Sequence, residues 1–173
     1  MKVTLYLTIS VNGHIATADD KTPWTDIAWD TYLEAVKRFG NVIFGRRTYE
    51  FLKKNDDFKD FEKRPLVVAV THSNESSNDQ FKIVDSPVAA LEAIKAAGFD
   101  NAMVGGGSDL ATSFLAAGLV DEIELDIDPI LIGKGINILK DVNLEQKLQF
   151  VSSKELSEGV LHLVYKVKKD SNG

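Results

Sequence analysis

The feature that most constrains the fold is the alternation of short apolar runs with stretches of helical periodicity. Apolar and polar residues alternate over 3–10, whereas 66–70 is continuously apolar, as in a strand covered on both faces. Further strands are expected at 41–44, 81–84, 102–104, 120–127, 148–151 and 160–167, and helices at 27–39, 46–54, 87–97 and 109–117. Strands that alternate with helices predict a three-layer α/β/α fold with a mainly parallel central sheet. The last two strands have only a turn between them, which predicts an antiparallel C-terminal hairpin.

The composition is that of a globular protein and limits the classes of function. The chain has 173 residues, 44% of them hydrophobic and 27% charged, so one domain is expected over 1–168 with a frayed tail over 169–173. It contains no cysteine, which excludes disulfides, thiolate zinc sites and a cysteine nucleophile. The net charge of −6 opposes nucleic-acid binding, which needs a basic face, but leaves a small anionic ligand open.

Neither a signal peptide nor a membrane span is predicted. The first seven residues have the pattern of a strand, and no small-residue cleavage site follows them. No apolar run reaches the roughly 18 residues that a membrane-spanning helix requires. We therefore expect a cytoplasmic protein with no membrane partner.

Two of the expected helices carry recognisable end signals. Thr25 or Asp26 is suited to cap the helix at 27–39, and Gly40 follows its last apolar residue. Ser86 and Pro87 suit the N-cap and the first position of the helix at 87–97.

Three consecutive glycines, Gly105, Gly106 and Gly107, stand between an expected strand and an expected helix, with Ser108 near the N-cap. Glycine allows a ligand to approach the backbone closely, and the first N–H groups of a helix are unpaired at the positive end of its dipole. The junction therefore predicts a site for a phosphate or pyrophosphate; the alternative is a tight turn without a ligand. It differs from the G-x-G-x-x-G dinucleotide fingerprint, because Leu110 occupies the third glycine position.

A second strand-to-helix junction repeats this arrangement at Gly45, Arg46, Arg47 and Thr48. Two arginines are electrostatically unfavourable at a helix N-terminus, and a bound phosphate would remove the conflict. Arginine also binds phosphate oxygens in a bidentate manner. We interpret Arg46 as a ligand-binding residue and leave Arg47 open between that role and a solvated surface.

Five segments along the chain together carry a family resemblance. They are SVNGHIA at 10–16, VIFGRRTYE at 42–50, VGGG at 104–107, GLVDEI at 118–123 and PILIGKG at 129–135. In this order they resemble the dihydrofolate reductase-like family, and most closely the C-terminal reductase domain of bacterial bifunctional riboflavin biosynthesis proteins. The resemblance implies a dihydrofolate reductase-like fold, NADPH as the cofactor and a tendency to form homodimers.

The resemblance also assigns roles to the two junctions. It places the junction at 45–48 on the adenosine phosphates of NADPH, the glycine turn on the pyrophosphate, and the residues after the strand at 66–70 beside the adenine ribose. The expected cofactor-binding residues are Gly45, Arg46, Arg47, Thr48, Thr71, His72, Ser73, Gly105, Gly106, Gly107 and Ser108.

The residues that the resemblance would place near the substrate depart further from the family pattern than those near the cofactor. The riboflavin-pathway reductases carry aspartate where this chain has Asn12, and asparagine cannot accept a proton. Family members that act on folate use an acid on the first helix, for which Asp26, Asp30 and Glu34 are candidates. We take Ser10, Asn12 and Asp30 as candidate catalytic residues. Their alternatives are a strand-end hydroxyl, a turn residue and a solvated helix face.

Other polar and aromatic residues give weaker indications. No metal site is expected, because the three histidines are far apart and none is paired with a carboxylate at ligand spacing. Lys134, between two glycines, could contact a substrate phosphate or lie on a loop surface. Trp24 could support a planar ring, whereas Trp29 is expected to pack.

These observations predict an NADPH-dependent oxidoreductase. Its small-molecule substrate would be a planar nitrogen heterocycle, either 5-amino-6-(5-phosphoribosylamino)uracil-like, as in the riboflavin pathway, or pterin-like. The alternative is a nucleotide-binding protein of the same fold without catalytic turnover. A second copy of the chain, in a homodimer, is the expected protein partner.

Overall fold

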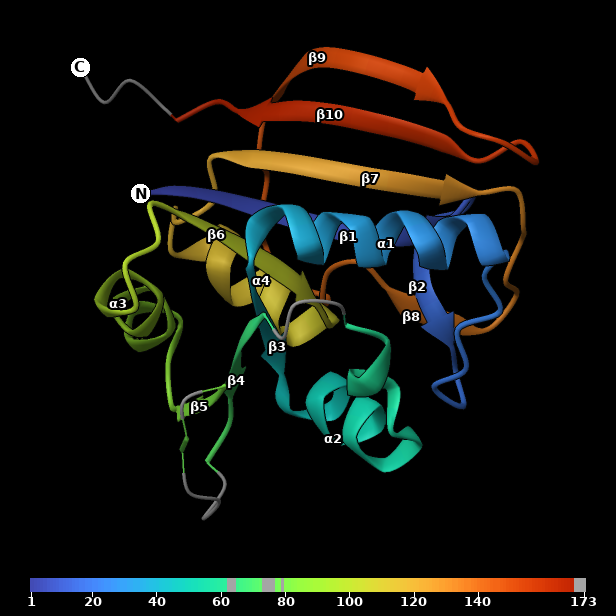
Figure 1. Ribbon diagram of the computed structural model, residues 1–173. Helices are drawn as coiled ribbons and strands as arrows, with labels where there is room; N and C mark the ends of the chain where they lie inside the picture. The colour runs from blue at the N-terminus through green and yellow to red at the C-terminus, as the bar shows by residue number, and fades with distance from the viewer. Residues whose placement is uncertain (62–64, 73–76, 79, 170–173) are drawn as a thin grey trace.

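An eight-stranded sheet forms the middle layer of the protein in the computed structural model, which describes residues 1–61, 65–72, 77–78 and 80–169 (Figure 1). The strands lie in the order β5-β4-β3-β6-β1-β7-β10-β9. In chain order they are β1 (Lys2–Ser10), β3 (Asn41–Gly45), β4 (Leu66–Val70), β5 (Phe81–Val84), β6 (Asn101–Gly106), β7 (Glu122–Asp128), β9 (Leu148–Glu155) and β10 (Leu161–Val167).

Strand directions in the sheet agree with the prediction. The strands from β5 to β7 pair in parallel, and β10 runs antiparallel to both β7 and β9. The C-terminal hairpin therefore extends an otherwise parallel sheet at one edge. Residues 170–173 of the expected frayed tail lie outside the described residues, and the N–H of Lys168 donates to the carbonyl of Lys147 at 2.9 Å.

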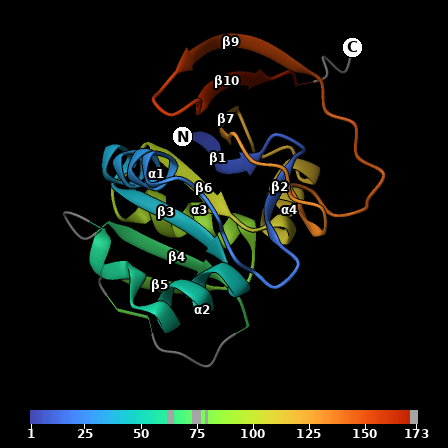
Figure 2. The same cartoon turned by 90° about the vertical axis from the view of Figure 1, so that its right-hand side faces the viewer.

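Helices cover both faces of the sheet, as the alternation of elements predicted. They are α1 (Asp26–Phe39), α2 (Arg46–Asn55), α3 (Pro87–Ala96) and α4 (Ser108–Ala116). Buried side chains of α1 and α2 pack with Tyr6 on one face, and those of α3 and α4 pack with Leu5 on the other. Figure 2 shows α1 and α4 on opposite sides of β1 and β6. None of the described helices combines the length and hydropathy that a membrane crossing requires.

The helix ends follow their sequence signals. Thr25, rather than Asp26, caps α1 by accepting a hydrogen bond from the N–H of Ala28 at 3.3 Å. Gly40 ends the helix in the left-handed conformation with φ 69°, which glycine adopts without a steric penalty. Ser86 caps α3 with Pro87 in its first turn.

Two short elements were not predicted. Residues 57–60 form a 3₁₀ helix, η1 (Asp57–Asp60), within a segment that has the composition of a charged loop. Phe58 anchors it by packing against the rings of Phe44, Tyr49 and Phe81. The other is β8 (Gly135–Asn137), which pairs with β2 (His14–Thr17) in a separate two-stranded sheet. Three residues are too few to show a strand periodicity.

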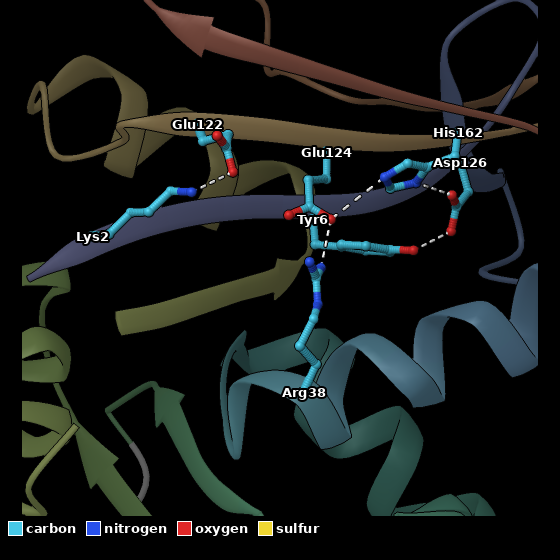
Figure 3. Close-up of polar contacts among 7 residues, drawn as sticks. All are labelled: Lys2, Tyr6, Arg38, Glu122, Glu124, Asp126 and His162. Carbon is cyan, nitrogen blue, oxygen red and sulfur yellow. Dashed lines mark hydrogen bonds and ion pairs between the residues drawn. The ribbon is translucent and has the colours of Figure 1, made fainter. Parts of the chain in front are cut away.

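A row of buried carboxylates lies along the face of β7 that is turned toward α1 (Figure 3). Its members are Glu122, Glu124, Asp126 and Asp128. Buried carboxylates are costly unless they are paired, and each of these has a partner from another element. Lys2 Nζ, for example, lies 2.7 Å from Glu122.

Two members of this row hold α1 at its two ends. Near the C-terminus of α1, Arg38 Nη2 lies 2.6 Å from the carboxylate of Glu124. At the N-terminus, Asp128 accepts hydrogen bonds from both the N–H and the hydroxyl of Thr25, at 2.9 and 2.8 Å. The helix is therefore attached to β7 at both of its ends.

Asp126 joins β1 to the hairpin. It accepts a short hydrogen bond from the hydroxyl of Tyr6, and its other oxygen lies 2.7 Å from His162 Nδ1 on β10. The hydrogen bond with Asp126 raises the pKa of His162 above its usual value, although partial burial lowers it; Glu124, 3.6 Å from His162 Nε2, adds a second negative charge.

The raised pKa of His162 predicts a pH-dependent stability. Between about pH 6.5 and the higher folded-state pKa, the folded chain binds more protons than the unfolded chain, so the free energy of unfolding falls as pH rises. We expect His162→Gln to remove this part of the pH dependence in urea denaturation measured from about pH 5.5 to about pH 8.5. Lys154→Gln, at the cross-strand neighbour of His162, is the control. Identical pH profiles for the native chain and His162→Gln would contradict the prediction.

Candidate functional site

A cavity of about 790 Å³ opens at the carboxyl ends of the parallel strands, which is where α/β sheets bind their ligands. Gly45 ends β3, Gly106 ends β6, and Thr71 follows β4; all three line the cavity. The helices α2 and α4 begin directly after the first two of these strands. Two helix N-termini therefore open on one cavity.

The first residue of the glycine turn, Gly105, has no room for a side chain. A Cβ on Gly105 would collide with the hydroxyl of Tyr32 and would lie 2.6 Å from Val42 Cγ2. Gly106 has φ 131°, a conformation that L side chains rarely adopt, and Gly107 caps α4. The carbonyl of Gly105 accepts a hydrogen bond of 2.8 Å from the buried hydroxyl of Tyr32 on α1. This turn is thereby held in place by α1 as well as by the sheet.

The second junction lies beside the first. Gly45 caps α2 without a side-chain hydrogen bond, so the first N–H groups of the helix have no side-chain acceptor at the N-cap. A Cβ on Gly107 would lie 3.2 Å from Thr48 Oγ1, which shows how closely the two turns approach. Arg47 lies 2.6 Å from both carboxylate oxygens of Asp20, in the loop after β2. Arg46 lines the same cavity and forms no ion pair with another described residue.

The end of β4 contributes a hydroxyl without a partner. Thr71 is buried, lines the cavity, and has no hydrogen-bond partner for its Oγ1 within the described part of the chain. A buried hydroxyl without a partner is costly, and a ligand hydroxyl or phosphate would satisfy it. His72 also lines the cavity, whereas Ser73 lies outside the described residues. The other expected cofactor-binding residues, from 45–48 and 105–108, line it as well.

The three candidate catalytic residues do not line this cavity. Ser10 donates to the side-chain oxygen of Asn12, and the amide of Asn12 bonds both the N–H and the carbonyl of Ile132, at 3.1 and 2.8 Å. These bonds tie the turn after β1 to the loop after β7. Asp30 is exposed on α1. These placements fit the alternative interpretations: Ser10 is a hydroxyl at a strand end, Asn12 is a turn residue, and Asp30 lies on a solvated helix face.

Aromatic side chains form part of the cavity wall, and one of them, Tyr32, also contacts the glycine turn. Trp29 and Tyr32 on α1 stack with ring centroids 5.8 Å apart and an interplanar angle of 7°. Trp24, before α1, and Phe51, on α2, line the same space. Trp29 was expected to pack, and its stacking partner Tyr32 occupies an ordinary apolar position of the helical pattern. The sequence therefore gives no indication that the two rings stack on each other.

Charged residues of the cavity wall include several that sequence reasoning missed. Asp57 and Asp60 of η1 line the cavity, as does Lys140, which lies 3.3 Å from the carboxylate of Asp109. Lys134 does not line it. Among the described residues, no group of three or more histidine and acidic side chains could hold a metal ion.

The sequence profile of the RibD C-terminal domain matches residues 1–162. The chain belongs to the RibD C-terminal domain family. It is 24% identical to the uncharacterized protein YyaP of Bacillus subtilis, over 95% of this chain and 94% of YyaP. It is 28% identical to the riboflavin biosynthesis protein RibD of Corynebacterium ammoniagenes, over 79% of this chain but only 45% of that protein. The chain thus spans about half the length of that RibD.

Solved structures confirm the predicted fold. A crystal structure of a putative riboflavin biosynthesis protein from Shewanella superimposes with a TM-score of 0.79 and 20% identity, covering 98% of this chain and 100% of that one. The Thermotoga maritima diaminohydroxyphosphoribosylaminopyrimidine deaminase/5-amino-6-(5-phosphoribosylamino)uracil reductase superimposes with a TM-score of 0.74 and 20% identity, covering 96% of this chain and 56% of that one.

The close packing around Gly105 predicts that no larger residue is tolerated there. We expect Gly105→Ala to lower the free energy of unfolding by about 1–3 kcal/mol, because the new methyl group overlaps Tyr32 and Val42. Gly133→Ala, at a glycine with open space around it, is the control and should stay within about 0.5 kcal/mol of the native chain. Equal denaturation midpoints for the two variants would show that the turn does not have this packing.

Proposed function

We infer that this protein is an NADPH-dependent reductase of a planar nitrogen heterocycle. The observation that carries the proposal is the meeting of two glycine-bounded helix N-termini in one cavity that also has an aromatic wall. Arg46 and Arg47, in the first turn of α2, line the same cavity. Helix N-termini of this kind bind phosphate groups, and a family that includes a uracil reductase supports the oxidoreductase assignment.

The residues present fit such a cofactor. Gly106, whose φ of 131° favours glycine, and Gly107, the N-cap of α4, line the cavity, and Thr71 supplies a buried hydroxyl that has no partner among the described residues. We assign the pyrophosphate to Gly106, Gly107 and the N-terminus of α4, and the adenosine phosphates to Gly45, Arg46 and Thr48 on α2. Thr71, with His72, is assigned to the adenine ribose. The cation at Arg46 favours NADPH over NADH, because only NADPH carries a 2′-phosphate.

The chain's own residues would orient the substrate. When bound, the nicotinamide supplies a hydride, and the protein must hold a planar acceptor against it in near-attack geometry. Trp29, fixed by its stacking on Tyr32, offers a flat apolar surface for that acceptor, and Trp24 and Phe51 line the same space. Leu7, toward the carboxyl end of β1, adds an apolar wall that excludes water.

A nucleotide-binding protein without turnover is the second candidate function. The observation that favours it is the absence of Ser10, Asn12 and Asp30 from the cavity wall. The two candidates share the cofactor site and differ in whether NADPH is oxidised when a heterocyclic substrate is added.

Cofactor binding is tested by thermal unfolding. NADPH at about 100 times its Kd should stabilise the chain by about 2.7 kcal/mol, and NADH at the same concentration should stabilise it less. Arg46→Gln should weaken NADPH binding while leaving NADH binding nearly unchanged. Lys54→Gln, at an exposed lysine on the same helix outside the cavity, is the matched control. Failure of NADPH to shift the unfolding temperature of the native chain would refute both candidate functions.

A homodimer formed through the hairpin is the proposed assembly. The edge strand β9 is exposed along its whole length and carries Leu148, Phe150 and Val151 on the surface. Exposed apolar edge strands usually pair with or are covered by another chain. Light scattering should therefore give twice the chain mass of 19.1 kDa, and Phe150→Asp should shift the protein toward the monomer. A native chain that is monomeric at about 100 μM, well above typical dimer dissociation constants, would exclude this assembly.

A further inference from the structure

We propose that Thr8 is a substrate-binding residue whose hydroxyl forms a hydrogen bond with a ring nitrogen or carbonyl group on the edge of the heterocycle. This inference rests on the proposed function and deepens it, because it names a residue that would select the substrate. The three candidate catalytic residues from the sequence do not line the cavity, whereas Thr8 does.

The hydroxyl of Thr8 is largely buried and yet unpaired. The residue is 9% exposed and lines the cavity. In the part of the chain that the structure describes, no residue forms a hydrogen bond with its Oγ1. A hydroxyl withdrawn from bulk water is costly unless a partner replaces that water. Because Thr8 belongs to the cavity wall, a ligand in the cavity can supply the partner.

The position of Thr8 in β1 directs its side chain toward α1. Side chains alternate between the two faces of a strand, so Thr8 shares a face with Tyr6. Tyr6 packs with the buried side chains of α1 and α2, whereas Leu7 packs with those of α3 and α4. Thr8 therefore points to the side of the sheet on which Trp29 and Tyr32 lie.

Contacts at the end of β7 place the first turns of α1 over this part of β1. Ser10, which lies two residues beyond Thr8 on the same face, is the register partner of Asp128. Asp128 in turn binds Thr25, the N-cap of α1. Trp29, in the first turns of the helix, lines the cavity as Thr8 does. The sheet and the helix therefore contribute a hydroxyl and an aromatic ring to the same space.

This pairing suits a flat ring with a polar edge. A neutral hydroxyl donates one hydrogen bond and accepts others, so it matches the ring nitrogens, N–H groups and carbonyls of pyrimidines and pterins. Thr71 also has a hydroxyl without a partner among the described residues, but it follows β4 and is assigned to the cofactor. Thr8 lies on β1, outside both glycine junctions, and we therefore assign it to the substrate.

Thr4 provides a matched control on the same strand. It lies on the same face of β1 as Thr8 and is fully buried, and its Oγ1 has no hydrogen-bond partner among the described residues. It does not line the cavity. Thr4→Val and Thr8→Val therefore remove the same group from the same strand and differ in whether a ligand can reach that group.

The first measurement is the midpoint of urea denaturation without ligand. Thr8→Val keeps the β-branched shape that strands favour and removes an unpaired hydroxyl, so the midpoint should stay unchanged or rise. A residue that serves binding at the expense of stability behaves in this way. A lower midpoint for Thr8→Val would show that the hydroxyl stabilises the fold, and would overturn the proposal.

The second measurement is substrate binding to the chain saturated with NADP⁺, by calorimetry. The probes are 5-amino-6-(5-phosphoribosylamino)uracil and pterin, one from each proposed substrate class. At least one should bind the native chain, and Thr8→Val should raise its Kd about two- to tenfold, as expected for the loss of one neutral hydrogen bond. Thr8→Ser retains a hydroxyl and should bind that probe nearly as tightly as the native chain. Thr4→Val should leave the Kd unchanged.

Three results would overturn the proposal: failure of both probes to bind, equal Kd values for the native chain and Thr8→Val, or an equal loss in Thr4→Val. Weaker NADP⁺ binding by Thr8→Val would also overturn it, because the hydroxyl would then contact the cofactor. Since NADP⁺ is titrated separately, these results are distinguishable from failure of the proposed function. A chain that binds NADP⁺ normally but is insensitive to Thr8→Val keeps its reductase assignment and loses only this substrate contact.

Discussion

The parallel pairing of β3 with β6 is the constraint on which the site depends. It sets Phe44 opposite Gly106, so the two strands end side by side and the helices that follow them begin at the same place. Each strand end alone would be an ordinary strand-to-helix turn. Together they direct two sets of unpaired N–H groups into one cavity, and the sheet maintains their spacing through its hydrogen bonds.

The helix α1 adds a second constraint from outside the sheet. Arg38 and Thr25 attach its two ends to carboxylates of β7, and Tyr32 reaches the carbonyl of Gly105. The rings of Tyr6 and Tyr32 lie 5.7 Å apart in an edge-to-face contact. Contacts therefore run without interruption from the hairpin, through Asp126 and the two tyrosines, to the glycine turn. These contacts hold the wall of the cavity in place, which lowers the conformational cost of binding.

Much of the architecture was predictable because local signals and periodicity carry it. The caps at Thr25 and Ser86, the turn at Gly40 and the two glycine junctions all form as the sequence indicated. The rest depends on contacts between residues far apart in the chain. Nothing around position 32 or position 105 signals that they touch, and the stacking of Trp29 on Tyr32 follows from the path of α1 over the sheet.

The roles of polar residues were harder to predict, because a polar side chain near a turn fits both a catalytic role and a structural one. Asn12 is the clearest example: its position in a family motif suggested chemistry, yet its amide bonds both backbone groups of Ile132. The burial of the acidic residues of β7 was equally difficult to predict. A strand of alternating acids and aliphatic residues has the pattern of one solvated face, whereas in this fold that face is buried and neutralised from α1, β1 and β10.

The ion pair between Asp20 and Arg47 has a consequence for how an anion would enter. Asp20 belongs to the loop after β2 and Arg47 to α2, and both line the cavity. An incoming phosphate would therefore take part in an exchange reaction, displacing one anionic partner of Arg47 by another. Only the difference in free energy between the pairing of Arg47 with the phosphate and its pairing with Asp20 then contributes to affinity. The loop that carries Asp20 becomes free to move against the ligand. A phosphate that binds Arg47 at this end of the cavity must therefore compete with the carboxylate of Asp20, which belongs to the protein itself.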